Sequence, residues 1–176
     1  MTILKPSHPE IDSILELFTQ GRLNIVLKKI SQLNNDFPDQ ALLSNISGAC
    51  HVGLGQLNDA IKCYEDAIAI APDYAKAHYN LGGVLHEMDN LDDAIQSYQK
   101  SLIIDPDYAE AHNNLGNIFR EIGQFDDAMQ CFKNAVNLNP DYIEAQYSLA
   151  ITLHHLGDKE SIEHFEKVVD LKPDFA

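Results

Sequence analysis

The chain has 176 residues, a length that fits one domain or one short repeat array and leaves no room for a second catalytic domain. Its 27 Asp and Glu residues outnumber 12 Lys and Arg residues, and the net charge of −15 disfavours nucleic acid and anionic lipid as partners because the basic residues are not clustered. The sequence has no signal peptide, and its three cysteines match no disulfide or metal-ligand spacing, which predicts a cytoplasmic protein. It also has no apolar stretch long enough to span a membrane, so no membrane insertion is predicted.

Proline recurs with a regular period and is followed by Asp each time. Pro38, Pro72, Pro106 and Pro140 are equally spaced along the chain, and Pro173 comes one position early. Proline cannot continue a helix, and an Asp carboxylate can accept the free N–H groups at the next helix start. The pattern predicts one array of five repeats, at about 7–38, 39–72, 73–106, 107–140 and 141–173.

Each repeat also has a break near its middle, which divides it into two helices. The break residues are Gly or Asp, which tolerate the left-handed conformation that ends many helices. They lie at Gly21, Gly55, Asp89, Gly123 and Gly157. We therefore predict an all-α solenoid of five helical hairpins.

In the first two repeats the packing residues of the first helix lie one position earlier relative to the proline. This interpretation groups Leu43, Ile46, Ser47 and Cys50 in the second repeat and Ile11, Ile14, Leu15 and Phe18 in the first. Leu15 and Val26 are bulky where the other repeats have small residues, so the first hairpin is predicted to be an end cap.

The register is clearest in the third and fourth repeats. In their first helices His78, Leu81, Gly82 and Leu85 correspond to His112, Leu115, Gly116 and Phe119. The second helices bury one face each, built around small Ala94 and Ala128 and an aromatic residue one turn later. A capping-box pattern, Asp followed three residues later by Glu, is predicted to start two first helices, at Asp107 with Glu110 and at Asp141 with Glu144.

The fifth repeat is one residue shorter between Gly157 and Ser161. Its apolar side, with Ile162, Phe165 and Val169, is predicted to be partly uncovered, which favours end-to-end self-association. The sequence stops at a repeat boundary, and we expect the chain to be a fragment of a longer protein.

This pattern resembles the tetratricopeptide repeat family over nearly the whole chain. The segments at 75–82 and 109–116 are most similar to the superhelical arrays of O-linked N-acetylglucosamine transferases. The resemblance implies right-handed stacking, with the first helices lining a concave groove. It does not identify a ligand, because function depends on the site and not on the fold.

Two sets of residues are candidates for lining such a groove. In the transferase-type arrays an asparagine ladder is associated with holding an extended peptide, and a primary amide can both donate to and accept from a peptide backbone. The first set here comprises Asn45, Asn80, Asn114 and Ser148, with Tyr79, Asn113, Asn117 and Tyr147 beside it. The alternative is that these amides satisfy neighbouring backbone groups and that the others form a solvated face.

The second set is cationic or can become so, and comprises His51, His86, Arg120 and His154. In an acidic protein, aligned groups of this kind favour an anionic feature in the ligand. The alternative is a row of solvated side chains near the helix ends.

No nucleophile with a fitting base, phosphate-binding loop or metal-ligand cluster is found, so neither an enzyme nor a cofactor is predicted. The sequence favours a non-enzymatic scaffold that binds a protein or peptide partner. The alternative is the substrate-selecting or targeting array at the amino terminus of a larger enzyme, such as a glycosyltransferase.

Overall fold

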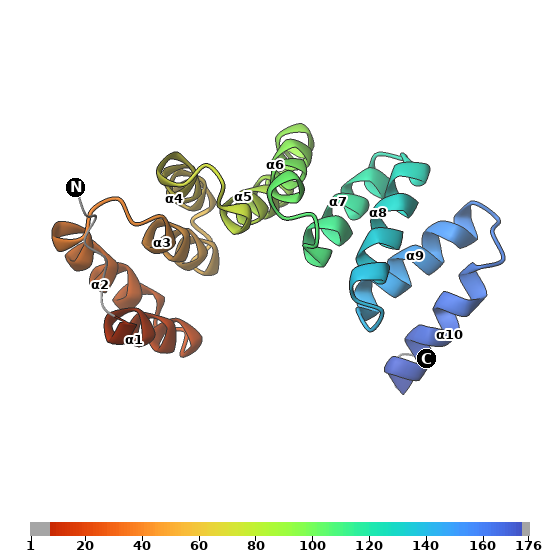
Figure 1. Ribbon diagram of the computed structural model, residues 1–176, viewed down its shortest axis with the longest axis horizontal. Coiled ribbons are helices and arrows are strands. Elements are labelled where there is room, and N and C mark those ends of the chain that lie inside the picture. The colour runs from red at the N-terminus through yellow and green to blue at the C-terminus, as the bar shows by residue number, and fades with distance from the viewer. Residues whose placement is uncertain (1–7, 174–176) are drawn as a thin grey trace. The chain divides into compact units, whose positions relative to one another are not determined.

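The structure, a computed structural model, describes residues 8–173, and every regular element in that range is a helix (Figure 1). The prediction of an all-α protein of tandem helical hairpins is confirmed. The ten helices of this range are α1 (His8–Thr19), α2 (Leu23–Asp36), α3 (Ala41–Gly53), α4 (Leu57–Ile70), α5 (Ala75–Glu87), α6 (Leu91–Ile104), α7 (Ala109–Glu121), α8 (Phe125–Leu138), α9 (Ile143–His155) and α10 (Ser161–Leu171). They form two compact units, divided between Asn90 and Leu91, which are described separately below.

The first unit contains α1 to α5, and each helix packs against the next in sequence. Its core is built around the buried side chains of Ile14, Val26, Ile30 and Leu43 at the α1–α3 end. A second cluster joins α4 to α5 through Ala60, Tyr64 and Val84. Bulky Val26 is fully buried at the position that Ala60 occupies in the next hairpin.

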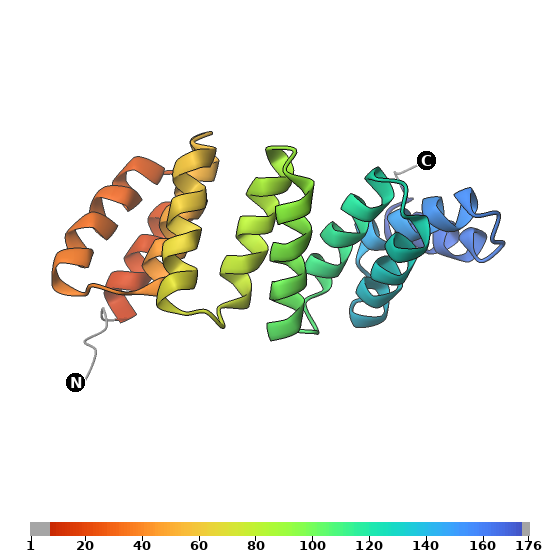
Figure 2. The same ribbon diagram turned by 90° about the horizontal axis from the view of Figure 1, so that it is seen from above.

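The second unit contains α6 to α10, again with successive helices in contact. Within this unit α7 pairs with α8 and α9 pairs with α10, and Figure 2 shows these helices from above. Its largest cluster joins α8 to α9 through Ala128, Phe132, Leu149 and Leu153, all of them almost inaccessible to solvent. Small Ala128 lets the helices approach closely, and Phe132 fills the space one turn later.

All five predicted mid-repeat breaks have the left-handed conformation. The φ angles are 71° at Gly21, 72° at Gly55, 78° at Gly123 and 75° at Gly157. At the third break Asp89 has a φ of 60°, a conformation that short polar side chains tolerate better than branched ones do. The turn within each hairpin therefore depends on a residue that the sequence identifies.

The predicted one-residue slip in the second repeat is wrong. Helices α3, α5 and α7 begin at Ala41, Ala75 and Ala109, with the same regular spacing as the prolines. A Cβ added at Gly48 would lie 2.5 Å from the Tyr64 ring, just as one at Gly116 would lie 2.8 Å from the Phe132 ring. Gly48, and not Ser47, is therefore the small residue beneath the aromatic ring.

The same correction applies to the first helix. Ile14 is completely buried at the position of Gly48, whereas Leu15 is 44% exposed. The bulky residue that distinguishes the first hairpin is therefore Ile14, because the side chain one position later points away from the core.

The predicted capping boxes do not form. The N-cap residues of α7 and α9 are Tyr108 and Tyr142, one position after the Asp, and neither makes a side-chain cap. Asp107 and Asp141 instead donate their backbone N–H groups, at 3.2 Å, to the Oδ1 atoms of the residues two positions earlier, Asp105 and Asn139. These bonds stabilise the turn before each helix, so the Asp after the proline belongs to the turn.

A side chain in the first turn of three first helices ties back to the preceding proline. The ring Nε2 atoms of His78 and His112 each lie 3.0 Å from the carbonyl oxygens of Pro72 and Pro106, and Gln146 Nε2 donates to the Pro140 carbonyl at 2.8 Å. A carbonyl only accepts, so both histidines carry a proton on Nε2. This tie fixes the angle at which each first helix leaves the turn.

Candidate functional site

Two asparagines from successive repeats are hydrogen bonded to each other in the first unit. Asn80 Nδ2, on α5, donates to Asn45 Oδ1, on α3, at 2.9 Å. In the corrected register Asn80 occupies the same helix position as Ile46. The hydrogen-bond partner of Asn80 is nevertheless the residue before Ile46, Asn45. Asn45 is 5% exposed, whereas Asn80 is half-buried. Asn80 is therefore the member that a ligand could touch, and Asn45 holds it in place.

Asn80 retains hydrogen-bonding capacity after this contact. An amide offers two N–H donors and one acceptor oxygen. Within residues 8–173, the bond to Asn45 is the only one that the Asn80 side chain makes. Its carbonyl oxygen and one N–H group are thus available on a partly exposed surface.

In the second unit the predicted amides are differently placed. Asn114 is half-buried and donates to the Tyr98 hydroxyl at 3.5 Å, while Asn113 Nδ2 donates to Asn114 Oδ1 at 3.3 Å. Asn113 is only 4% exposed and Ser148 only 7% exposed. The expectation that these two residues line a surface is corrected, since neither presents an exposed side chain.

The two predicted tyrosines have different surroundings. Tyr79 is half-buried, whereas Tyr147 is 38% exposed and packs edge-on against Phe165 of α10, with 6.2 Å between the ring centroids. Tyr147 therefore offers a flat apolar surface whose orientation is fixed by a neighbour.

Arg120 is held in place by two contacts, neither of them with an acid. One of its terminal nitrogens, Nη2, donates to Asn117 Oδ1 at 3.1 Å, and the guanidinium carbon lies 5.6 Å from the centre of the Phe132 ring. Arg120 is half-buried and makes no ion pair with any described residue. In a chain with far more acidic than basic residues, this leaves an oriented cation with unused donors.

The histidines of the predicted cationic row do not form one set. His51 corresponds in register to Leu85 and not to His86, and its Nδ1 lies 2.7 Å from Gln56 Oε1. His86 is half-buried on α5, and His154 is exposed on α9. His86, Arg120 and His154 do share one helix position in successive repeats, whereas His51 does not.

The surroundings of the two buried cysteines, Cys50 and Cys131, keep their thiols unreactive. Burial, and to a smaller extent Cys63, raises the pKa of the Cys50 thiol to about 11; burial, and then Asp127, raises the pKa of Cys131 to about 11. Both stay protonated at neutral pH and pack as small apolar residues. No group of three or more His, Cys, Asp or Glu residues in the described range is arranged to hold a metal ion.

His164 on α10 extends one of the proline ties and makes the fold sensitive to pH. Its Nδ1 donates to Gln146 Oε1 at 2.7 Å, and burial lowers the pKa of His164, although Glu160 and Glu163 oppose this. The unfolded chain then binds a proton more readily than the folded chain. The stability that neutral His164 contributes is therefore fully present above the unfolded pKa of about 6.5. It is lost as the pH falls from there towards the lower pKa of His164 in the folded chain.

We therefore expect His164→Gln to reduce the loss of stability between about pH 7.5 and pH 5.5. Urea unfolding of both proteins at the two pH values measures the difference, because the other histidines contribute equally to both. An identical pH dependence in the variant would show that His164 binds its proton equally well in the folded and unfolded chains.

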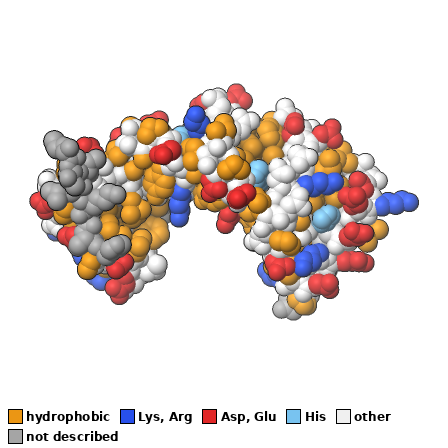
Figure 3. Space-filling view, in the orientation of Figure 1, with side chains coloured by type: hydrophobic (Ala, Val, Ile, Leu, Met, Phe, Trp, Pro, Cys, Tyr) orange, Lys and Arg blue, Asp and Glu red, His pale blue; other side chains and the backbone are white. Residues whose placement is uncertain are grey.

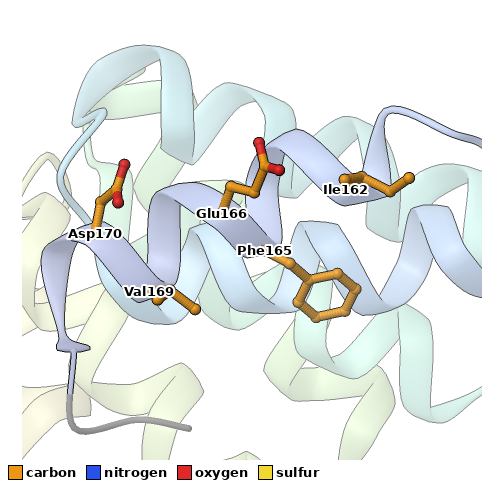
Figure 4. Close-up of a pocket in the computed structure, with 5 residues that line it drawn as sticks. All are labelled: Ile162, Phe165, Glu166, Val169 and Asp170. Atoms are coloured by element: carbon orange, nitrogen blue, oxygen red, sulfur yellow. The ribbon is translucent and has the colours of Figure 1, made fainter.

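The outer face of α10 is apolar, and no helix of the described range lies over it as α9 lies over α8. Ile162 is 59% exposed and Val169 is 48% exposed, which confirms the predicted exposure of this side. With Phe165, Glu166 and Asp170 they line a shallow pocket of about 330 Å³ (Figure 4). Elsewhere on the face drawn in Figure 3, basic and acidic side chains lie among one another and form no basic patch.

No helix in the described range is both long and apolar enough to span a membrane. The fold defines a helical repeat protein, in which the same two-helix hairpin recurs along the chain.

A family profile described as TPR repeat matches residues 51–89, 84–119 and 116–157, and one described as tetratricopeptide repeat matches 143–175. The chain belongs to the tetratricopeptide repeat family. No curated protein sequence matches it.

Several solved structures share the fold. MamA residues 41 to the end from Desulfovibrio magneticus RS-1 is 19% identical, with 99% of each chain covered and a TM-score of 0.82. A crystal structure of MamA is 20% identical, with 97% of each chain covered and a TM-score of 0.81. YrrB, described as a TPR protein with an unusual peptide-binding site, is 20% identical over 97% of this chain and 88% of its own, with a TM-score of 0.74.

Proposed function

We propose that this chain is a non-enzymatic scaffold that binds an extended peptide segment of a partner protein along its first helices. The observation that carries the proposal is the Asn45–Asn80 pair, in which a buried amide orients a half-buried one. The similarity to YrrB supports it to the extent that a protein of this fold is described as binding a peptide.

The Asn80 amide suits a peptide backbone of any sequence. Its free oxygen can accept a backbone N–H group, and its remaining N–H can donate to a backbone carbonyl. Because Asn45 already fixes the amide, little side-chain entropy is lost on binding. Recognition at this point would depend on an extended conformation and not on the ligand's side chains.

In the second unit, Arg120 supplies a different kind of contact. Asn117 and the Phe132 ring hold its guanidinium, which keeps donors for a carboxylate or phosphate. We therefore propose that a ligand bound there carries an acidic group. The three free cysteines suit a reducing compartment, and the proposal keeps the predicted cytoplasmic location.

The test uses peptides of about ten residues, selected by display from a random library on the intact chain. We expect Asn80→Ala to weaken binding of a selected peptide roughly tenfold in calorimetry, because two hydrogen bonds of ~0.5–1.5 kcal/mol each are lost. Asn45→Ala should weaken it less, since Asn80 then loses only its orientation.

The matched control is Asn137→Ala, which removes an exposed amide from α8. Circular dichroism should show the same helical content in all variants. If Asn80→Ala binds as tightly as the control, the peptide does not use this amide, and a library that yields no binding peptide contradicts the proposed function itself.

A further inference from the structure

The outer face of α10 differs from the equivalent face of α8 in that no helix within residues 8–173 covers it, although the Tyr147 ring meets Phe165 edge-on. When the two helices are aligned on their buried faces, Ile162, Phe165 and Val169 correspond to Met129, Phe132 and Val136. Phe132 is completely buried, whereas Phe165 is only half-buried. The same three-residue apolar surface is thus present twice, once covered and once open.

The covered copy shows what this surface receives. On α8 it packs beneath α9, whose Leu149 and Leu153 join Phe132 in one buried cluster with Met129 and Val136 at its edge. Leu149 and Leu153 are four residues apart and lie on one face of their helix. The apolar surface of a second helix of this family therefore fits a helix that presents two aliphatic side chains at that spacing.

The polar residues around the open copy are acidic, whereas those at the covered copy are neutral or basic. Glu163, Glu166 and Asp170 stand on α10 where α8 has Gln130, Lys133 and Asn137. Two of these acids, Glu166 and Asp170, line the apolar pocket itself, as Figure 4 shows. Carboxylates at the rim of an apolar site favour basic residues on whatever covers it.

We propose that the outer face of α10 docks an amphipathic helix of a partner protein, with two aliphatic side chains four residues apart set against Phe165 and with Lys or Arg on its flanks. A second copy of this chain suits the face poorly. Its net charge is −15, and its α1 exposes Asp12 and Glu16. The predicted end-to-end self-association, which would use the same face, is the rival outcome of the test.

The probe is a synthetic peptide of residues 141–157, which contains α9, with Lys at the exposed positions 144, 147 and 154. A second peptide carries Glu at the same positions, and both keep Leu149 and Leu153. We expect the Lys peptide to bind the intact chain at least about tenfold more tightly than the Glu peptide in fluorescence anisotropy. The double variant Glu166→Gln, Asp170→Asn should remove most of this preference.

Ile162→Glu should weaken binding of the Lys peptide by about tenfold or more. The matched control is Ile103→Glu on α6, which changes another exposed isoleucine, 72% accessible, in the same unit. Equal effects of the two substitutions, or equal binding of the two peptides, would overturn the proposal. So would self-association of the wild-type chain in sedimentation velocity that Ile162→Glu abolishes, because the face would then bind a second copy.

Discussion

Phe132→Ala is expected to lower the free energy of unfolding by about 3–5 kcal/mol, the largest effect of any substitution considered for this chain. The ring is completely buried among Ala128, Leu149 and Leu153. Its removal leaves a cavity between α8 and α9 and takes away the aromatic face that lies beneath Arg120. Urea unfolding followed by circular dichroism measures the loss, provided that the transition remains cooperative.

Phe165→Ala is the matched control for this prediction. It makes the same change at the corresponding position of α10, where the ring is half-buried and meets Tyr147 edge-on. Less apolar surface is returned to water, so the loss should be no more than about half as large. Equal losses in the two variants would show that the cover provided by α9 is not what makes Phe132 important.

Gly116→Val is expected to cost about 1–3 kcal/mol by overpacking. A Cβ at this position would lie 2.8 Å from the Phe132 ring and 3.1 Å from Cys131 Cβ, and both neighbours are buried. Valine recovers only a few tenths of a kcal/mol in helix propensity over glycine. The loss should appear as a lower melting temperature.

The control for Gly116→Val is Asn137→Val, which introduces the same side chain at an exposed position of α8. Its melting temperature should change little. A Gly116→Val protein as stable as this control would mean that the Phe132 ring can move aside, and that the close approach of α7 to α8 does not require glycine.

The parts of the fold that depend on single residues were predictable from the sequence. Proline and glycine act through their own backbone angles, so their spacing identified the breaks at Gly55 and Gly123 before any packing was known. The amphipathic second helices were predictable for a similar reason. One buried face with Ala128 and Phe132 follows from helix periodicity alone.

The register of α3 could not be settled in this way. Ser47 and Gly48 are both small, and apolar residues lie on both sides of them, so the pattern within this helix fits either residue; only the spacing that Gly48 shares with Gly82 and Gly116 favours Gly48. What distinguishes them is the Tyr64 ring, which occupies the space next to Gly48. That contact joins two helices, and a pattern within one helix carries no information about it.

The candidate site was predictable in kind but not in detail. The sequence pointed to Asn80 and Arg120, but it could not show that Asn45 orients the first or that Asn117 and Phe132 hold the second. It also placed Asn113 on the surface. Its position before Asn114 suggested this, whereas the neighbouring helices bury it. Burial of a polar side chain depends on tertiary packing, which the spacing of residues does not report.

The ties between first helices and the preceding prolines bear on how such a sequence can change. His78, His112 and Gln146 are chemically different, yet each supplies an N–H donor at the same reach from a proline carbonyl six residues earlier. Donor and acceptor lie within one short stretch of chain, so the hydrogen bond that sets the direction of each first helix is formed by residues close together in sequence. Duplication of this stretch would duplicate both the donor and the acceptor. Histidine and glutamine could replace each other at this position without changing the direction of the helix that follows the turn.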